Sequence, residues 1–76
     1  MAISAYVFID CTEDPDEVVS ALREIEGVVR ADGLFGSVEV VAIIEAPDLA
    51  GLDLVIEAIR EIPEVEFTDT RIVRDI

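Results

Sequence analysis

The segment Val28–Glu45 constrains the fold of this 76-residue chain most strongly. Its second half, from Val38 to Ile44, reads VEVVAII and is the most apolar and most β-branched run in the sequence. β-Branched side chains pack well on a pleated, buried surface and crowd the preceding turn of a helix. The run therefore predicts a buried strand.

A turn that contains two glycines interrupts this segment. Gly33 and Gly36 flank two apolar residues, and glycine supplies the positive φ angles that a chain reversal can require. The segment is therefore expected to form a hairpin in the middle of the chain, with one strand over Val28–Phe35 and the next over Ser37–Glu45.

A strand and a helix are predicted before the hairpin. Ile3–Asp10 alternates as a strand does, and both of its faces are largely apolar. Thr12 or Asp14 can cap a helix whose first turn accepts the proline that follows. Apolar residues at helical spacing continue to Ile25, and Gly27 is expected to end the helix as a left-handed cap.

The same signals recur after the hairpin. An Ala-Pro-Asp sequence at 46–48 precedes an apolar stripe at helical spacing that runs from Leu49 to Ile62. Pro63 stops this second helix, because proline lacks the amide hydrogen that a helix interior needs. Val65–Val73 then reads as the last strand.

The predicted order is therefore β-α-β-β-α-β, in one domain that spans residues 1–76. Two interleaved right-handed β-α-β units of this kind give an α+β, ferredoxin-like fold, in which two helices cover one face of a four-stranded antiparallel sheet. Apolar residues make up 53% of this short chain, and the strands are apolar on both faces. A second copy that packs sheet to sheet is expected to cover the bare face.

Charge excludes several classes of partner. Eighteen acidic residues against five arginines give a net charge of −13, which repels nucleic acid and anionic lipid. The chain has no apolar run near the roughly 20 residues that span a bilayer and no basic region before an apolar stretch. A soluble, cytoplasmic protein is expected. The acidic surface without lysine also suits a halophilic source, where salt screens self-repulsion.

Catalysis is not expected. The chain has no histidine, and its single cysteine, Cys11, lies at a strand end without the electropositive surroundings that activate a thiol. No glycine-rich phosphate loop and no metal-ligand spacing occurs. We therefore predict no catalytic residue, no metal and no cofactor.

Two short stretches are candidate binding sites. One is Gly36-Ser37-Val38-Glu39 at the hairpin, and the other is Thr68-Asp69-Thr70 in the last strand. On a strand, Thr68 and Thr70 point to the same face, which places two hydroxyls side by side. By themselves these residues favour an ordinary hairpin and strand, because threonine is a good strand former.

The same stretches resemble a known family. The order of elements, the ending V-x-x-T-D-T-R-I-V, the G-x-x-E at the hairpin and the I-P-x-V before the last strand are similar to the Lrp/AsnC effector-binding domain, also called the RAM domain. The resemblance extends over essentially the whole chain. Many family members carry a DNA-binding helix-turn-helix. This chain resembles instead the stand-alone RAM proteins of prokaryotes, archaea especially.

The resemblance implies a function. RAM domains pair sheet to sheet as homodimers that join into octamers or decamers, and a free amino acid binds in a cleft between dimers. A stand-alone member is expected to join full-length regulators of the family and to modulate transcription. The ligand contacts of the family fall on these positions of the chain: Gly36, Glu39, Thr68 and Thr70, with Leu34, Phe35 and Ser37 beside them.

Three alternatives stay open on the sequence. An ACT-type amino-acid sensor shares the same order of elements, with its ligand site near the first loop. A purely structural oligomerisation partner would bind no ligand at all. A dimeric α+β barrel enzyme shares the fold, although the lack of histidine argues against it. The sequence leaves open which amino acid binds, the oligomer size and the partner regulator.

Overall fold

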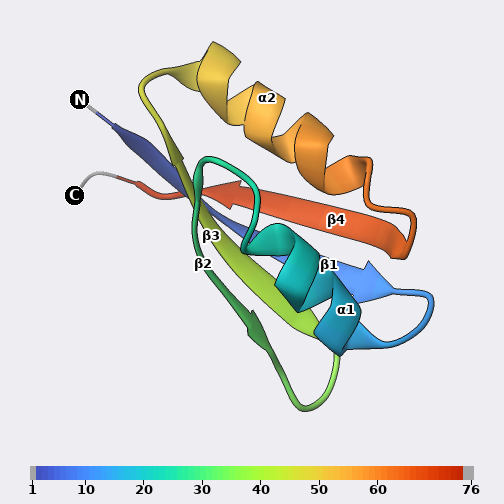
Figure 1. The fold of residues 1–76 in the computed structure, drawn as a ribbon. Coiled ribbons are helices and arrows are strands. Elements are labelled where there is room, and N and C mark those ends of the chain that lie inside the picture. The colour runs from blue at the N-terminus through green and yellow to red at the C-terminus, as the bar shows by residue number, and fades with distance from the viewer. Residues whose placement is uncertain (1, 75–76) are drawn as a thin grey trace.

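The computed structural model describes residues 2–74 and confirms the predicted order of elements (Figure 1). The first half contains β1 (Ile3–Cys11), α1 (Pro15–Leu22) and β2 (Val28–Gly33). The second half contains β3 (Val40–Ala46), α2 (Leu49–Arg60) and β4 (Val65–Ile72).

The four strands form one antiparallel sheet in the order β2-β3-β1-β4. Both helices lie on the same side of this sheet (Figure 1). The ferredoxin-like arrangement predicted from the sequence is therefore confirmed. The sheet order makes β2 and β4 the two edge strands, with β3 and β1 between them.

The core lies between the sheet and the two helices. Strand residues at every second position, such as Val7 and Ile9 of β1, are fully buried on this side. Leu22 of α1 and Ile59 of α2 are buried against them. No polar or charged residue is buried anywhere within residues 2–74, so the interior holds no hidden charged group.

Both helices begin at the predicted positions. The Asp14 carboxylate caps α1 by accepting a hydrogen bond from the Asp16 amide at 3.0 Å. The Asp48 carboxylate caps α2 in the same way, with the Gly51 amide as donor at 2.7 Å. An aspartate at this position satisfies one of the four amide groups that a helix leaves without a partner.

Both helices end earlier than predicted. The chain leaves α1 after Leu22, where the Ile25 amide bonds the carbonyl three residues back at 3.1 Å. It leaves α2 after Arg60 through a similar bond from Ile62 to Ile59. These tighter i→i−3 bonds end the α-helical repeat while the apolar spacing still continues. The prediction that Gly27 caps α1 is therefore wrong.

Gly27 instead begins the approach to β2. Its φ angle is +100°, and a Cβ added there would lie 2.5 Å from Cγ2 of Val55 in α2. Its carbonyl accepts the Glu45 amide at 2.8 Å. Glycine is needed at this position because the backbone passes directly under α2.

The hairpin is looser than predicted. The strands stop at Gly33 and begin again at Val40, so residues 34–39 form a loop rather than the ends of two strands. The last strand pair, Gly33 with Val40, is followed by one hydrogen bond from the Leu34 amide to the Glu39 carbonyl at 2.7 Å. Of the two glycines predicted to need a positive φ, only Gly36 has one, at +105°.

Candidate functional site

The hairpin loop brings five of the seven predicted site residues together. The hydrogen bond between residues 34 and 39 closes the loop, and the positive φ of Gly36 turns the chain at its tip. Phe35 is fully exposed, at 110% of its reference area, and Leu34 is 44% exposed. The loop thus presents apolar side chains outward. The five residues are Leu34, Phe35, Gly36, Ser37 and Glu39.

The Glu39 carboxylate points back toward the end of β1. Its Oε1 accepts a hydrogen bond from the Cys11 amide at 3.3 Å. Partial burial of Cys11 raises the pKa of its thiol, and the negative charges of Glu39, Asp10 and Glu64 raise it further. The thiol therefore stays protonated at neutral pH, which agrees with a structural role for Cys11.

The two predicted threonines lie in the edge strand β4. Thr68 is paired with Ile9 and Thr70 with Val7. Both partners are fully buried under the helices, so both threonines share the helix-covered face of the sheet, as their spacing predicts. Both threonines are half-buried.

The loop and the threonines do not meet within one chain. Glu39 directly precedes β3, and β1 separates β3 from β4 in the sheet. Two strand spacings amount to about 10 Å. The predicted residues thus form two groups, one at the hairpin loop and one on β4. No cavity found in the structure of residues 2–74 contains members of both groups.

Ser37 takes part in a separate pocket on the bare face of the sheet. This pocket of about 320 Å³ is lined by Phe8, Ser37, Val38, Asp69 and Arg71. The Arg71 guanidinium lies 5.7 Å from the centre of the Phe8 ring and forms an ion pair with Asp69 at 3.1 Å. Ser37 therefore faces the side of the sheet away from the two threonines.

Thr68 lines a cavity at the other edge of the sheet that the sequence did not reveal. The cavity measures about 260 Å³ and lies between the end of α2 and the start of β4. It combines a guanidinium, a carboxylate and a hydroxyl with two apolar side chains. The lining residues are Arg60, Val65, Glu66, Phe67 and Thr68.

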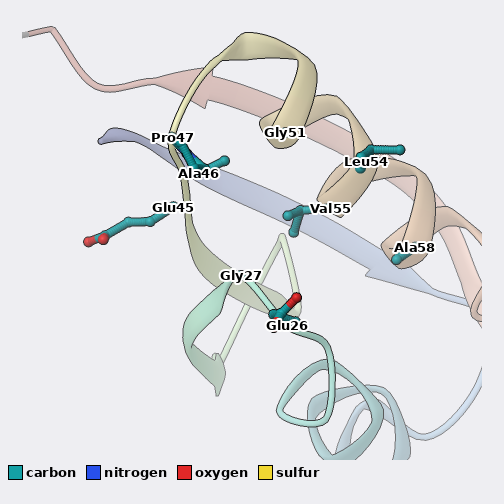
Figure 2. A pocket seen from close by; sticks show the side chains of 9 residues that line it. All are labelled: Glu26, Gly27, Glu45, Ala46, Pro47, Gly51, Leu54, Val55 and Ala58. Atoms are coloured by element: carbon teal, nitrogen blue, oxygen red, sulfur yellow. The ribbon is translucent and has the colours of Figure 1, made fainter. Parts of the chain in front are cut away.

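An apolar groove lies between α2, the end of β3 and the Glu26-Gly27 segment that precedes β2 (Figure 2). It measures about 420 Å³, and small residues such as Gly27 and Ala58 leave the space open. Val55 points toward Gly27 across the groove, whereas the Glu45 carboxylate points away from it (Figure 2). None of the predicted site residues lines this groove.

The described part of the chain has neither a metal-binding cluster nor a membrane-spanning helix. Residues 2–74 contain no group of three or more acidic, cysteine or histidine side chains placed to hold a metal ion. No helix among these residues is long and apolar enough to cross a membrane.

The comparison with protein families decides the identity of the domain. The model of the Lrp/AsnC ligand binding domain matches residues 4–75. The chain belongs to this family. No curated protein sequence matches it.

Solved structures with the same fold span nearly the whole chain. The hypothetical protein PHS023 from Pyrococcus horikoshii superposes with a TM-score of 0.86 and 26% sequence identity, over 100% of this chain and 93% of that one. FFRP-DM1 superposes with a TM-score of 0.84 and 26% identity, over 95% of this chain and 99% of that one.

A longer regulator also matches. The feast or famine regulatory protein Rv3291c of M. tuberculosis, solved in complex with L-methionine, has a TM-score of 0.80 and 24% identity. The match covers 97% of this chain and 51% of Rv3291c. The chain thus spans nearly all of some solved relatives and about half of others.

Proposed function

We propose that this protein is an amino-acid-binding regulatory module that assembles into homo-oligomers and has no catalytic activity. The observation that carries the proposal is membership of the Lrp/AsnC ligand binding domain family over residues 4–75. The L-methionine complex of Rv3291c, a structural relative, supports an amino acid as the ligand.

The separation of the two residue groups supports a site that two copies build together. In one chain Ser37 of the loop shares a pocket with β4 on the bare face, whereas Thr68 and Thr70 lie on the helix-covered face. A loop from one copy that approaches β4 of another copy would unite Gly36 and Glu39 with Thr68 and Thr70. This arrangement fits the cleft between dimers that the family resemblance implies. Binding would then depend on assembly.

The bare face of the sheet supports pairing with a second copy. Tyr6 is 44% exposed and Phe67 is 56% exposed on this face. Four of its charged residues are already paired within the chain, because Arg71 pairs with Asp69 at 3.1 Å and Arg30 with Asp32 at 2.6 Å. A second sheet can therefore cover the face without leaving these charges buried and unpaired. Further apolar residues of this face are Phe8, Val41 and Ile43.

Ligand and assembly are coupled if the site lies between copies. An amino acid can shift the oligomeric state only by the difference between its affinities for the two states. A chain of this kind would modulate a full-length regulator of the same family by joining its assembly. The octamer or decamer, a cytoplasmic location, and an archaeal, halophilic source stay predictions.

A thermal-shift series against the twenty amino acids tests the proposal. Because the net charge is −13, the series is run in high salt, which screens self-repulsion. A ligand at 100 times its dissociation constant stabilises the native state by about 2.7 kcal/mol. For a chain of this size that raises Tm by about 10 °C or more. One or a few amino acids should produce such a shift. The absence of any shift at millimolar concentrations would overturn the proposal in favour of a structural partner without a ligand.

A further inference from the structure

Phe35 is the most exposed of the large apolar side chains of residues 2–74. Its exposed fraction is 110% of the reference area, whereas the next in order, Leu54 of α2, reaches 66%. Phe35 stands at the tip of the hairpin loop, directly before Gly36, whose positive φ turns the chain. An aromatic side chain removes about 150–250 Å² from water when it is buried. The loop therefore presents a large apolar group of the kind that anchors protein interfaces.

The cavity beside Thr68 can receive an aromatic ring. It measures about 260 Å³, and Val65 and Phe67 contribute apolar walls. An engineered cavity of about 150 Å³ in another protein already binds benzene. The cavity therefore has room for the side chain of a phenylalanine.

A guanidinium completes the wall of this cavity. Arg60 comes from the last turn of α2 and lines the cavity across from β4. A guanidinium is attracted to the face of an aromatic ring. The chain already contains one such contact, because the Arg71 guanidinium lies 5.7 Å from the centre of the Phe8 ring. Arg60 offers the same contact to a ring that enters from outside.

A β-bulge shapes β4 where the cavity opens. Phe67 pairs with Asp10 and Val65 with Cys11, so Glu66 is the extra residue of the bulge. A bulge bends the strand and re-aims a side chain. The strand thus departs from its regular ladder at the residues that line the cavity.

Charge favours this cavity over the other hollows as the place where a second copy docks. Two copies with a net charge of −13 repel one another over most of their surfaces. The lining of the cavity contains one arginine and one glutamate, so its net charge is zero. The groove beside α2 contains two glutamates and no basic residue (Figure 2). The pocket on the bare face is also neutral, but it lies on the face that sheet pairing covers.

The loop and the cavity lie at the same end of the sheet. The loop joins β2 to β3, and Glu39 in it accepts a hydrogen bond from Cys11 at the end of β1. The segment before β4 is held at this same end, because the Thr12 amide bonds the Glu64 carbonyl at 2.9 Å. Two copies that meet end to end about a twofold axis can therefore each place a loop in the cavity of the other.

We propose that Phe35 of one copy inserts into the cavity beside Thr68 of a second copy, with its ring against the Arg60 guanidinium. This inference rests on the proposed function and names the contact that joins the two halves of the ligand site. The docked loop brings Gly36 and Glu39 of one copy beside the β4 threonines of the other. The amino acid site at the hairpin loop is then complete only between copies.

Sedimentation velocity over a range of protein concentrations tests the anchor. The runs are made without ligand and with the amino acid that gives the largest thermal shift. Phe35→Ala should weaken association beyond the sheet-paired dimer at least about tenfold, because truncating an aromatic anchor has a large effect on an interface.

Two control variants remove exposed apolar side chains elsewhere. Leu49 and Leu54 of α2 are 62% and 66% exposed, and Leu49→Ala and Leu54→Ala should associate within about twofold of wild type. Wild-type association in Phe35→Ala would overturn the inference. A wild-type protein that never exceeds a dimer in either condition would overturn it as well.

A double-mutant cycle tests the cavity as the docking site. Arg60→Ala should weaken association about two- to fivefold through loss of the ring contact. The double variant with Phe35→Ala should associate no more weakly than Phe35→Ala alone, because the two side chains share one contact. Additive losses would overturn the cavity as the docking site. Arg74→Ala makes the same charge change at an exposed residue outside the cavity, and its small effect should be additive. Loss of the Phe35 effect in Leu54→Ala instead would place the loop in the α2 groove and overturn the inference.

Calorimetry on the same variants separates the inference from the proposed function. Phe35→Ala should bind the amino acid at least about tenfold more weakly, because the contact builds the site. Wild-type affinity in a Phe35→Ala protein that no longer assembles would overturn the inference and leave the proposed function intact. A wild-type protein that binds none of the twenty amino acids would overturn the proposed function, whereas the effect of Phe35→Ala on assembly would still decide the contact.

Discussion

Three glycine positions give a graded test of the backbone geometry. Alanine at Gly27 meets two penalties, because φ is +100° and the new Cβ would lie 2.5 Å from Cγ2 of Val55 and 3.3 Å from the Glu45 carbonyl. Alanine at Gly36 meets only the first, since φ is +105° but no atom lies within 4 Å. Alanine at Gly33 meets neither, because its φ is not positive and its surroundings are open.

The expected costs follow from these contacts. A non-glycine residue with positive φ costs about 1–2 kcal/mol, and forcing a methyl group into a packed region costs about 1–3 kcal/mol more. Gly27→Ala should therefore lower the free energy of unfolding by about 2–5 kcal/mol and Gly36→Ala by about 1–2 kcal/mol. Gly33→Ala should be neutral or stabilising by up to about 1 kcal/mol, because it reduces the freedom of the unfolded chain.

Urea denaturation at one fixed protein concentration measures all three, since the stability of an oligomer depends on concentration. The order Gly27, Gly36, Gly33 is the essential result. A Gly27→Ala variant as stable as Gly33→Ala would refute the close passage of the backbone under α2.

Three further predictions concern the loop, the α2 cap and the thiol. Gly36→Val should weaken amino acid binding, measured by calorimetry, far more than Cys11→Ala does, because a valine at Gly36 distorts the hairpin loop. Equal effects of the two substitutions would contradict a ligand site at this loop. Asp48→Ala should lower the free energy of unfolding by about 1 kcal/mol through loss of the helix cap, whereas the exposed Asp53→Ala should change it by less than about 0.5 kcal/mol. The raised pKa of Cys11 should make iodoacetamide label the folded chain more slowly than the urea-unfolded chain at pH 8, since less thiolate is present. Faster labelling of the folded chain would contradict the partly buried, negatively charged surroundings of Cys11 in the structure.

The elements were predictable from the sequence because their signals are local. The β-branched run before Ile44 and the alternation of Ile3–Asp10 reflect burial in a sheet, and the aspartates before each helix act as caps in the structure. The ends of elements were less accessible. Val38 continues the apolar alternation of β3, so the sequence predicts a longer strand. In the structure β3 begins only at Val40, and the hydrogen bond from the Leu34 amide to the Glu39 carbonyl closes a loop before it.

The site was predictable only in its parts. The spacing of Thr68 and Thr70 predicts that they share a face, and the structure agrees. Ser37 lies on the opposite face of the sheet. This placement depends on the strand order and on the path of the hairpin loop, and no local sequence pattern encodes either of them. The bulge that brings Glu66 beside Arg60 depends on the pairing register between β1 and β4, so neither residue could be selected from its neighbours in the sequence.

Sedimentation velocity tests most directly whether the site lies between copies. The protein is centrifuged in high salt without ligand and then with increasing amounts of the amino acid that gives the largest thermal shift. Binding at a site shared between copies should shift the distribution toward a larger species over the same concentration range in which the ligand saturates. Saturation with no change in the sedimentation coefficient, at protein concentrations where smaller species are populated, would place the ligand within a single copy and contradict a shared site.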